Sequence, residues 1–227
     1  LIEYQDSDRL YVPIENLHLV QKYVAGEKHT PKLDKLGSQL WRRTKRRVKE
    51  EVEDIAQELI HIYAERQVKE GHAFSPEDEL YREMESRFEY AETDGQLAAI
   101  EDVLRDLKGP KPMDRLVCGD VGFGKTEVAM RAAFKVVMDN KQVLVLVPTT
   151  ILAQQHLKNF RDRFRDYPII VEMLSRFKGR KEQQAILEGL GKGSVDVVIG
   201  THRLLQKDLQ VRDLGLLIVD EEHRFGV

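Results

Sequence analysis

Residues 119–126 form a glycine-rich segment that ends in a lysine and a threonine. The segment reads Gly119-Asp120-Val121-Gly122-Phe123-Gly124-Lys125-Thr126 and fits the phosphate-loop pattern G-x-x-x-x-G-K-[ST]. The glycines let backbone N–H groups turn inward around phosphates, and the start of the following helix adds positive potential. Lys125 would reach the β- and γ-phosphates of ATP, and the hydroxyl of Thr126 would bind Mg²⁺. The alternative is a glycine-rich turn without a ligand.

An acidic pair follows the last apolar run of the sequence, at residues 214–219. Asp220 would lie at the carboxyl end of a buried strand, where it could hold Mg²⁺ directly or through water. Glu221 would orient and deprotonate the attacking water, a step that a kinase does not need. The pair therefore favours hydrolysis, although acidic strand ends also occur as solvated caps. We predict Lys125, Asp220 and Glu221 as the catalytic residues.

Alternating strand-like and helix-like segments surround these residues. Strands are predicted at 115–118, 143–147, 169–174, 195–199 and 214–219, and helical patterns at 124–138, 151–165 and 180–190 separate most of them. Near-continuous apolar strands with crossover helices indicate a parallel sheet that helices cover on both faces. The predicted fold class is therefore α/β, with the phosphate loop between a strand and the helix that follows it.

The first 71 residues have a different pattern. Residues 1–4 and 9–12 are apolar and aromatic runs around a turn-forming cluster, which predicts a short β-hairpin. Residues 38–70 carry apolar side chains three, four or seven positions apart, which predicts one amphipathic helix of about 30 residues. A basic cluster near its start opposes the helix dipole: Arg42, Arg43, Lys45, Arg46, Arg47 and Lys49. The cluster is either a binding surface for phosphates or acidic partners, or a solvated face that nearby glutamates balance.

The composition excludes several classes of protein. Of the 227 residues, 41% are hydrophobic and 33% are charged, so a packed core is expected. The net charge of −3 excludes a uniformly basic nucleic-acid coat, and the single cysteine excludes a disulfide framework. No apolar run approaches the roughly 18 residues of a membrane span, and no signal segment is visible. From these two features we expect a cytoplasmic protein without a membrane partner, and from the opening at Leu1 we expect a fragment of a longer chain.

Three segments resemble motifs of the superfamily 2 helicases and translocases. Residues 220–223 resemble their DExH box, and residues 147–155 and 199–205 resemble their motifs Ia and Ib, whose hydroxyls and helix-start amides suit DNA phosphates. A further candidate for a DNA backbone contact follows the strand at 169–174. The residues predicted to contact DNA are Thr149, Thr150, Gln154, Ser175, Arg176, Thr201, His202 and Arg203. Singly, each segment is also an ordinary helix cap.

Residues 88–96 resemble the adenine-recognising Q motif of the same superfamily. By this resemblance Gln96 bonds the donor and the acceptor of adenine, and Phe88 stacks on its ring. The sequence departs from the motif at Gly95, where relatives carry proline, which alters the expected stiffness of the loop. As an alternative role, Thr93 would cap a helix over residues 96–107.

Two longer stretches narrow the resemblance to the bacterial transcription-repair coupling factors. Residues 113–134 and 213–227 are similar to that family, and the RecG branch-migration helicases share the second stretch well. The N-terminal segment distinguishes the two families, because residues 4–17 resemble the end of the coupling factors' RNA-polymerase-interacting domain. The resemblance implies the end of that domain at 1–24, a linker with the long helix at 25–71, and a first RecA-like motor lobe at 72–227.

This resemblance also implies a function. The chain would be the ATP-binding lobe of a double-stranded DNA translocase that uses ATP and Mg²⁺. The whole protein would displace stalled RNA polymerase and work with nucleotide excision repair proteins. The isolated fragment is expected to be nearly inactive, because a second lobe would supply an arginine to the γ-phosphate. Two alternatives stay open: a RecG-type helicase lobe, and a nucleotide-binding interaction platform without turnover of its own.

Overall fold

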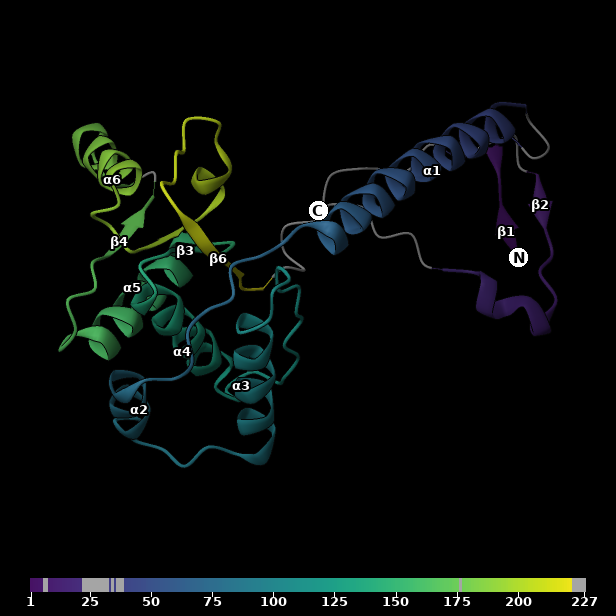
Figure 1. Cartoon of the computed structure of the whole chain (residues 1–227). Helices are drawn as coiled ribbons and strands as arrows, with labels where there is room; N and C mark the ends of the chain where they lie inside the picture. Colours follow the sequence, from purple (N-terminus) through teal and green to yellow (C-terminus); the bar gives the residue numbers. More distant parts are fainter. Residues whose placement is uncertain (6–7, 22–32, 34, 36–38, 176, 222–227) are drawn as a thin grey trace. The chain divides into compact units, whose positions relative to one another are not determined.

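A computed structural model describes residues 1–5, 8–21, 33, 35, 39–175 and 177–221 of the chain (Figure 1). It divides into two compact units, Leu1–Glu65 and Arg66–Val227. Among the described residues, no helix is both long and apolar enough to cross a membrane.

The first unit holds a two-stranded ribbon and most of a long helix. Strand β1 (Ile2–Glu3) pairs antiparallel with β2 (Arg9–Leu10), and a 3-10 helix, η2 (Ile14–Leu19), follows them. Helix α1 (Gln39–Val68) then runs for 30 residues. The predicted hairpin and the predicted helix are therefore both confirmed, although each strand is only two residues long. Ser38, the predicted start of the helix, lies outside the described residues.

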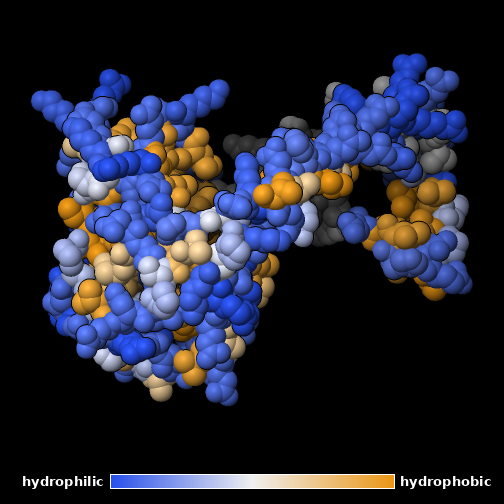
Figure 2. All heavy atoms as spheres, viewed as in Figure 1, coloured by the Kyte–Doolittle hydropathy of each residue, from blue (hydrophilic) through white to orange (hydrophobic). Residues whose placement is uncertain are grey.

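The surface of α1 carries both charged and apolar side chains, as Figure 2 shows. Part of the basic cluster is balanced within the helix, because Arg47 lies 3.4 Å from Glu51 and Lys49 lies 3.5 Å from Glu53. The apolar stripe is exposed at Val48, Val52, Ile55, Leu59 and Ile62. The second interpretation of the basic cluster, a face balanced by glutamates, therefore accounts for part of it.

A four-stranded parallel sheet forms the centre of the second unit. Its strands are β3 (Gln142–Leu146), β4 (Val171–Leu174), β5 (Val197–Gly200) and β6 (Leu214–Val219), in the order β4-β5-β3-β6. In the register of the sheet, Val145 of β3 lies opposite Ile199 on one side and Ile218 on the other. Four of the predicted strands are thus confirmed within a few residues, and the last one matches at both ends.

Helices cover both faces of this sheet (Figure 1). The connecting helices are α4 (Lys125–Met138), α5 (Thr150–Phe164) and α6 (Arg180–Lys192), and α2 (Glu79–Ser86) and α3 (Asp94–Leu107) precede them. Alternate residues of β3 enter two separate cores: Val143 and Val145 pack with α3, α4 and α5, and Leu144 and Leu146 pack with α6. The predicted α/β fold with a doubly covered parallel sheet is confirmed.

Residues 115–118, predicted as a strand, do not form one. Arg115 is instead tied to α3, with its guanidinium 2.9 Å from Asp102 and 2.6 Å from Asp106. Leu116 and Cys118 are exposed. A strand requires a neighbouring strand for its N–H and C=O groups, and in the described sheet this segment has none. The prediction was wrong because an apolar run does not reveal whether such a neighbour exists.

Candidate functional site

The phosphate-loop segment forms a turn that leads into α4. Gly122 and Gly124 have φ angles of 85° and 71°, a left-handed conformation that glycine adopts at no steric cost. Gly124 is the N-cap of α4 and provides no side-chain cap, and the N–H of Glu127, the third residue of the helix, donates to the oxygen of Gly124 at 2.9 Å. No side chain of the N-cap therefore covers the N–H groups of Lys125 and Thr126. The geometry fits an anion such as a phosphate, which binds at helix starts of this kind.

The side chain of Lys125 folds over the loop. Its Nζ donates hydrogen bonds to the backbone oxygens of Gly119 and Asp120, the second at 3.0 Å. The positive charge therefore lies within the turn, where it would neutralise a bound phosphate. Thr126 follows in the first turn of α4 and is half-buried.

Asp220 lies at the carboxyl end of β6, beside the end of β3, and its N–H donates to the oxygen of Leu146 at 3.0 Å. A hydrogen bond from His156, 2.8 Å from Oδ2, lowers the pKa of Asp220, while burial opposes this shift and the charge of Lys125 adds to it. The loop lysine and this carboxylate are thus brought near each other from distant parts of the sequence. An ionised carboxylate there fits Mg²⁺, which prefers oxygen ligands.

Glu221 follows Asp220 in an unusual backbone conformation. Its φ angle is 52°, which is uncommon for a residue other than glycine, and its N–H donates to Oδ1 of Asp220 at 3.1 Å. Strained backbone of this kind occurs at functional sites. Glu222 and His223 lie outside the described residues.

Gln96 ties α3 to the phosphate loop. Its Nε2 donates to the oxygen of Phe123 at 2.8 Å, and its Oε1 accepts from the N–H of Thr93 at 2.8 Å. Thr93 returns a bond to Gln96 and completes a capping box, so the predicted cap is confirmed. The contact with Phe123 was not predicted, because it joins residues that are far apart in the sequence. The contact of Gln96 with adenine stays a prediction.

Phe88 lies against two arginines. The guanidiniums of Arg131 and Arg163 are each 5.6 Å from the centre of its ring, and the ring of Tyr90 meets it edge-on at 5.6 Å. The side chain of Tyr90 is itself exposed. The stacking of Phe88 on adenine therefore also stays a prediction.

A buried cluster of charged side chains lies next to Phe88 and is centred on Arg131. Arg131 is 1% exposed and pairs with Glu127 at 2.9 Å, Glu85 at 2.8 Å and Glu92. Arg163 of α5 also pairs with Glu127, at 2.7 Å. The cluster thus joins α2, the segment before α3, α4 and α5. The sequence analysis missed it, because a glutamate and an arginine four residues apart resemble an ordinary surface pair on a helix.

The predicted DNA-contact segments follow three neighbouring strands of the sheet. Thr149 follows β3 and caps α5 by accepting from the N–H of Leu152 at 3.3 Å. Thr150 begins α5, and Gln154 is exposed one turn later. Thr201 follows β5 as the N-cap of the 3-10 helix η3 (His202–Leu205). Because the carboxyl ends of parallel strands share one edge, the structure brings these segments to the same edge of the sheet.

Two members of the predicted DNA set have restricted side chains. The hydroxyl of Ser175, after β4, is buried and has no hydrogen-bond partner among the described residues. Arg203 pairs with both carboxylate oxygens of Asp208, at 2.7 and 2.6 Å, and the bond lowers the pKa of that aspartate. His202 is exposed, and Arg176 lies outside the described residues.

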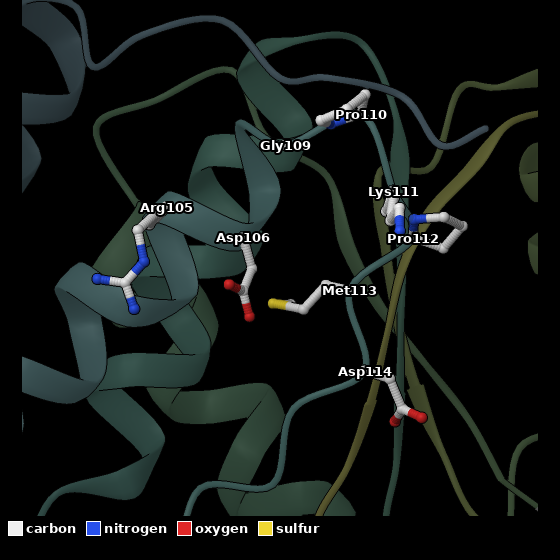
Figure 3. Close-up of a pocket in the computed structure, with 8 residues that line it drawn as sticks. All are labelled: Arg105, Asp106, Gly109, Pro110, Lys111, Pro112, Met113 and Asp114. Carbon is white, nitrogen blue, oxygen red and sulfur yellow. The ribbon is translucent and has the colours of Figure 1, made fainter. Parts of the chain in front are cut away.

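A shallow pocket of about 380 Å³ lies elsewhere, beside the end of α3 (Figure 3). It is lined by Arg105, Asp106, Gly109, Pro110, Lys111, Pro112, Met113 and Asp114. In Figure 3 the side chain of Met113 points toward Asp106. No residue predicted to bind nucleotide or DNA is among its lining, so this pocket is separate from the candidate site.

Comparison with known sequences agrees with the resemblances given above. The Transcription-repair-coupling factor of Bacillus subtilis is 58% identical over 226 residues, and that of Escherichia coli is 53% identical over 227 residues. Each alignment covers 100% of this chain but only 19% and 20% of the relative, so the chain spans about a fifth of their length. The predicted resemblance to the bacterial coupling factors is confirmed.

Solved structures show the same fold. RecG bound to a three-way DNA junction matches with a TM-score of 0.68 and 38% identity, over 73% of this chain and 23% of that one. A hypothetical ATP-dependent RNA helicase from Sulfolobus tokodaii matches with a TM-score of 0.50 and 20% identity, over 65% of this chain and 42% of that one. The latter similarity shows the RecA-like fold alone.

Family profiles divide the sequence between two descriptions. The profile of the CarD-like/TRCF RID domain matches residues 1–24, and that of the DEAD/DEAH box helicases matches residues 93–227. The second match contains the phosphate loop and the strand end at Asp220, the two parts that the fold brings together. Because it also spans more than half of the sequence, the chain belongs to the DEAD/DEAH box helicase family.

Proposed function

We propose that the chain contains the ATP-binding motor lobe of a double-stranded DNA translocase. The lobe would comprise residues 72–227, preceded by a linker at 25–71 and by the end of an RNA-polymerase-interacting domain at 1–24. The whole protein would act in the cytoplasm, displace stalled RNA polymerase and couple transcription to nucleotide excision repair. The identity to coupling factors along the entire chain and the RID profile at its start support this role over that of a RecG-type helicase.

The observation that carries the nucleotide-binding part is the convergence of Lys125 and Asp220. The hydrogen bond from His156 is the main cause of the lowered pKa of Asp220, and Lys125 lies close enough for its charge to lower that pKa further. The described residues contain no cluster of three or more metal-ligating side chains. Mg²⁺ would be shared between Asp220, Thr126 and phosphate oxygens, because in nucleotide sites it usually binds one or two protein oxygen ligands together with the phosphates.

Each residue of the site would have a distinct task in hydrolysis. The loop N–H groups and Lys125 would hold the phosphates, and Glu221 would orient water for in-line attack and accept its proton. When bound, Mg²⁺ would neutralise charge on the β- and γ-phosphates. Gln96 and Phe88 would contact the adenine. DNA phosphates would meet Thr149, Thr150 and the other segments at the same sheet edge.

Isothermal calorimetry of ATP binding to the 227-residue chain tests the proposal. Lys125→Ala should lose roughly 1.5–3 kcal/mol of binding free energy, or about tenfold or more in affinity, because the phosphates lose a charge-assisted partner. Lys192→Ala is the matched control, since that lysine is exposed on α6 and pairs only with Glu188 among the described residues. Glu221→Gln should bind ATP like the wild type. Unchanged affinity in Lys125→Ala would contradict the site.

Hydrolysis by this chain is expected to be very slow and insensitive to DNA. An arginine supplied to the γ-phosphate is worth roughly 10³–10⁵ in rate in related hydrolases, and a second lobe would provide it. A phosphate-release assay with and without duplex DNA measures this. Robust DNA-stimulated turnover by the homogeneous 227-residue chain would show that the lobe completes its own site.

A further inference from the structure

His156 is a buried polar residue on the apolar face of α5. Its side chain is 8% exposed, and the same face of the helix buries Ala153, Phe160 and Phe164. The rings of His156 and Phe160 meet edge-on, with centres 6.3 Å apart. A polar ring in such surroundings is costly unless it forms a hydrogen bond. The identity of its partner therefore determines what the residue does.

The partner of His156 is the carboxylate of Asp220. Nε2 of the ring lies 2.8 Å from Oδ2 of Asp220. An ionised carboxylate only accepts hydrogen bonds, so the hydrogen of this bond belongs to Nε2. The other ring nitrogen, Nδ1, is buried without a hydrogen-bond partner in the described part of the chain. Among the described residues, the bond to Asp220 is thus the one hydrogen bond of this ring.

Two separate elements hold the Asp220 carboxylate. Oδ2 is bonded by His156 of α5, and Oδ1 accepts the N–H of Glu221, the residue after Asp220. Rotation of the carboxylate would break at least one of these bonds. Each oxygen nevertheless keeps lone-pair capacity, since a carboxylate has about four acceptor positions in all. A carboxylate held in this way can bind a metal without first losing rotational freedom, which is how hydrogen-bonded neighbours tune metal ligands.

We propose that His156 is a positioning residue that holds Asp220 in the orientation needed to bind Mg²⁺ with a nucleotide. The inference rests on the proposed function, because it takes Asp220 as a ligand of Mg²⁺. His156 acts through Asp220 and not through the phosphate loop. Its loss should therefore weaken the part of nucleotide binding that depends on Mg²⁺ and spare the part that does not.

The test compares the ATP affinity of the 227-residue chain in Mg²⁺ and in EDTA, by calorimetry. In His156→Leu the gain in affinity from Mg²⁺ should fall by about tenfold, the effect of one hydrogen bond to a charged group, while affinity in EDTA stays within about twofold. His156→Gln should keep most of the gain, because its amide nitrogen can reach the position of Nε2. His156→Asn, with a shorter side chain, should behave like His156→Leu.

Asp220→Asn separates failure of this inference from failure of the proposed function. If the wild type binds ATP equally well in Mg²⁺ and in EDTA, the metal site of the proposed function is wrong. If Mg²⁺ strengthens binding in the wild type but not in Asp220→Asn, that site stands. The inference is then overturned if His156→Leu keeps the full gain, if it loses affinity equally in EDTA, or if His156→Gln is as impaired as His156→Leu. Thermal unfolding of each variant confirms that it is folded.

Discussion

Replacing Arg131 with methionine would test how far the buried charge cluster stabilises the second unit. Its side chain is 1% exposed, and its three guanidinium nitrogens pair with Glu127, Glu85 and Glu92. Methionine keeps much of the aliphatic length but removes all three ion pairs. Glu127 would keep its ion pair with Arg163. The Oε2 atom of Glu127 is already buried without a hydrogen-bond partner among the described residues.

The expected cost follows from the burial of each carboxylate. The side chain of Glu127 is 5% exposed, and loss of a partner from a buried pair costs about 3–5 kcal/mol. The side chains of Glu85 and Glu92 are 42% and 23% exposed, so solvent screening makes their pairs worth about 0–1 kcal/mol each. We therefore expect the free energy of unfolding of the second unit to fall by about 3–5 kcal/mol, chiefly through Glu127.

Urea unfolding followed by far-ultraviolet circular dichroism measures this effect. The urea midpoint should fall by more than about 1 M in Arg131→Met. Adding Glu127→Gln should recover part of the loss, because it removes a buried carboxylate that has kept only Arg163 of its two arginine partners. Arg105→Met, at an exposed arginine paired with Asp102, is the control. A loss below about 1 kcal/mol, or no recovery in the double variant, would refute the reasoning.

Two further variants test the surroundings of the site. The hydrogen bond with Arg131 lowers the pKa of Glu92 below its ordinary value of 4.5. Ionised Glu92 therefore stabilises the folded state at neutral pH, and this contribution is lost as the pH falls through the lowered pKa. Unfolding of Glu92→Gln between pH 6 and 3 should accordingly show a shallower loss of stability, and an unchanged slope would contradict this. Gly124→Ala should lower ATP affinity by about tenfold or more, because its φ of 71° disfavours alanine by roughly 1–2 kcal/mol. The added Cβ would also displace the amide of Gln96 that bonds Phe123 in the phosphate loop. Gly95→Ala, where an added Cβ meets no atom within 4 Å, should leave the affinity unchanged in the same titration.

Most of the second unit could be predicted from local patterns. Each confirmed strand is a short apolar run between polar segments, and each connecting helix begins near a polar or glycine residue that breaks the previous pattern. Helix α2 was missed because only Tyr81 and Met84 of its eight residues are buried, too few for a visible period. Its N-cap, Asp78, was the available signal. The error at residues 115–118 has the opposite cause, since an apolar run was present without a neighbouring strand.

The chemistry of the site could be predicted only where the residues that carry it are consecutive in the sequence. The phosphate loop and the acidic pair after β6 are continuous segments, so their spacing alone indicated nucleotide chemistry. The contacts of Gln96 with Phe123 and of Arg131 with Glu92 join residues from different elements, and no local pattern contains them.

His156 illustrates which part of the site the sequence predicts and which part only the fold determines. Its position on the buried face of α5, in register with Ala153 and Phe160, marks it from the sequence as a polar group that requires a partner. The sequence does not say which partner, because several strand ends carry polar residues at the same sheet edge. Only the order β4-β5-β3-β6 makes β6 the neighbour of the strand that leads into α5, and so places Asp220 within reach. A metal-binding carboxylate can thus be recognised from its motif, whereas the group that orients it follows from the strand order.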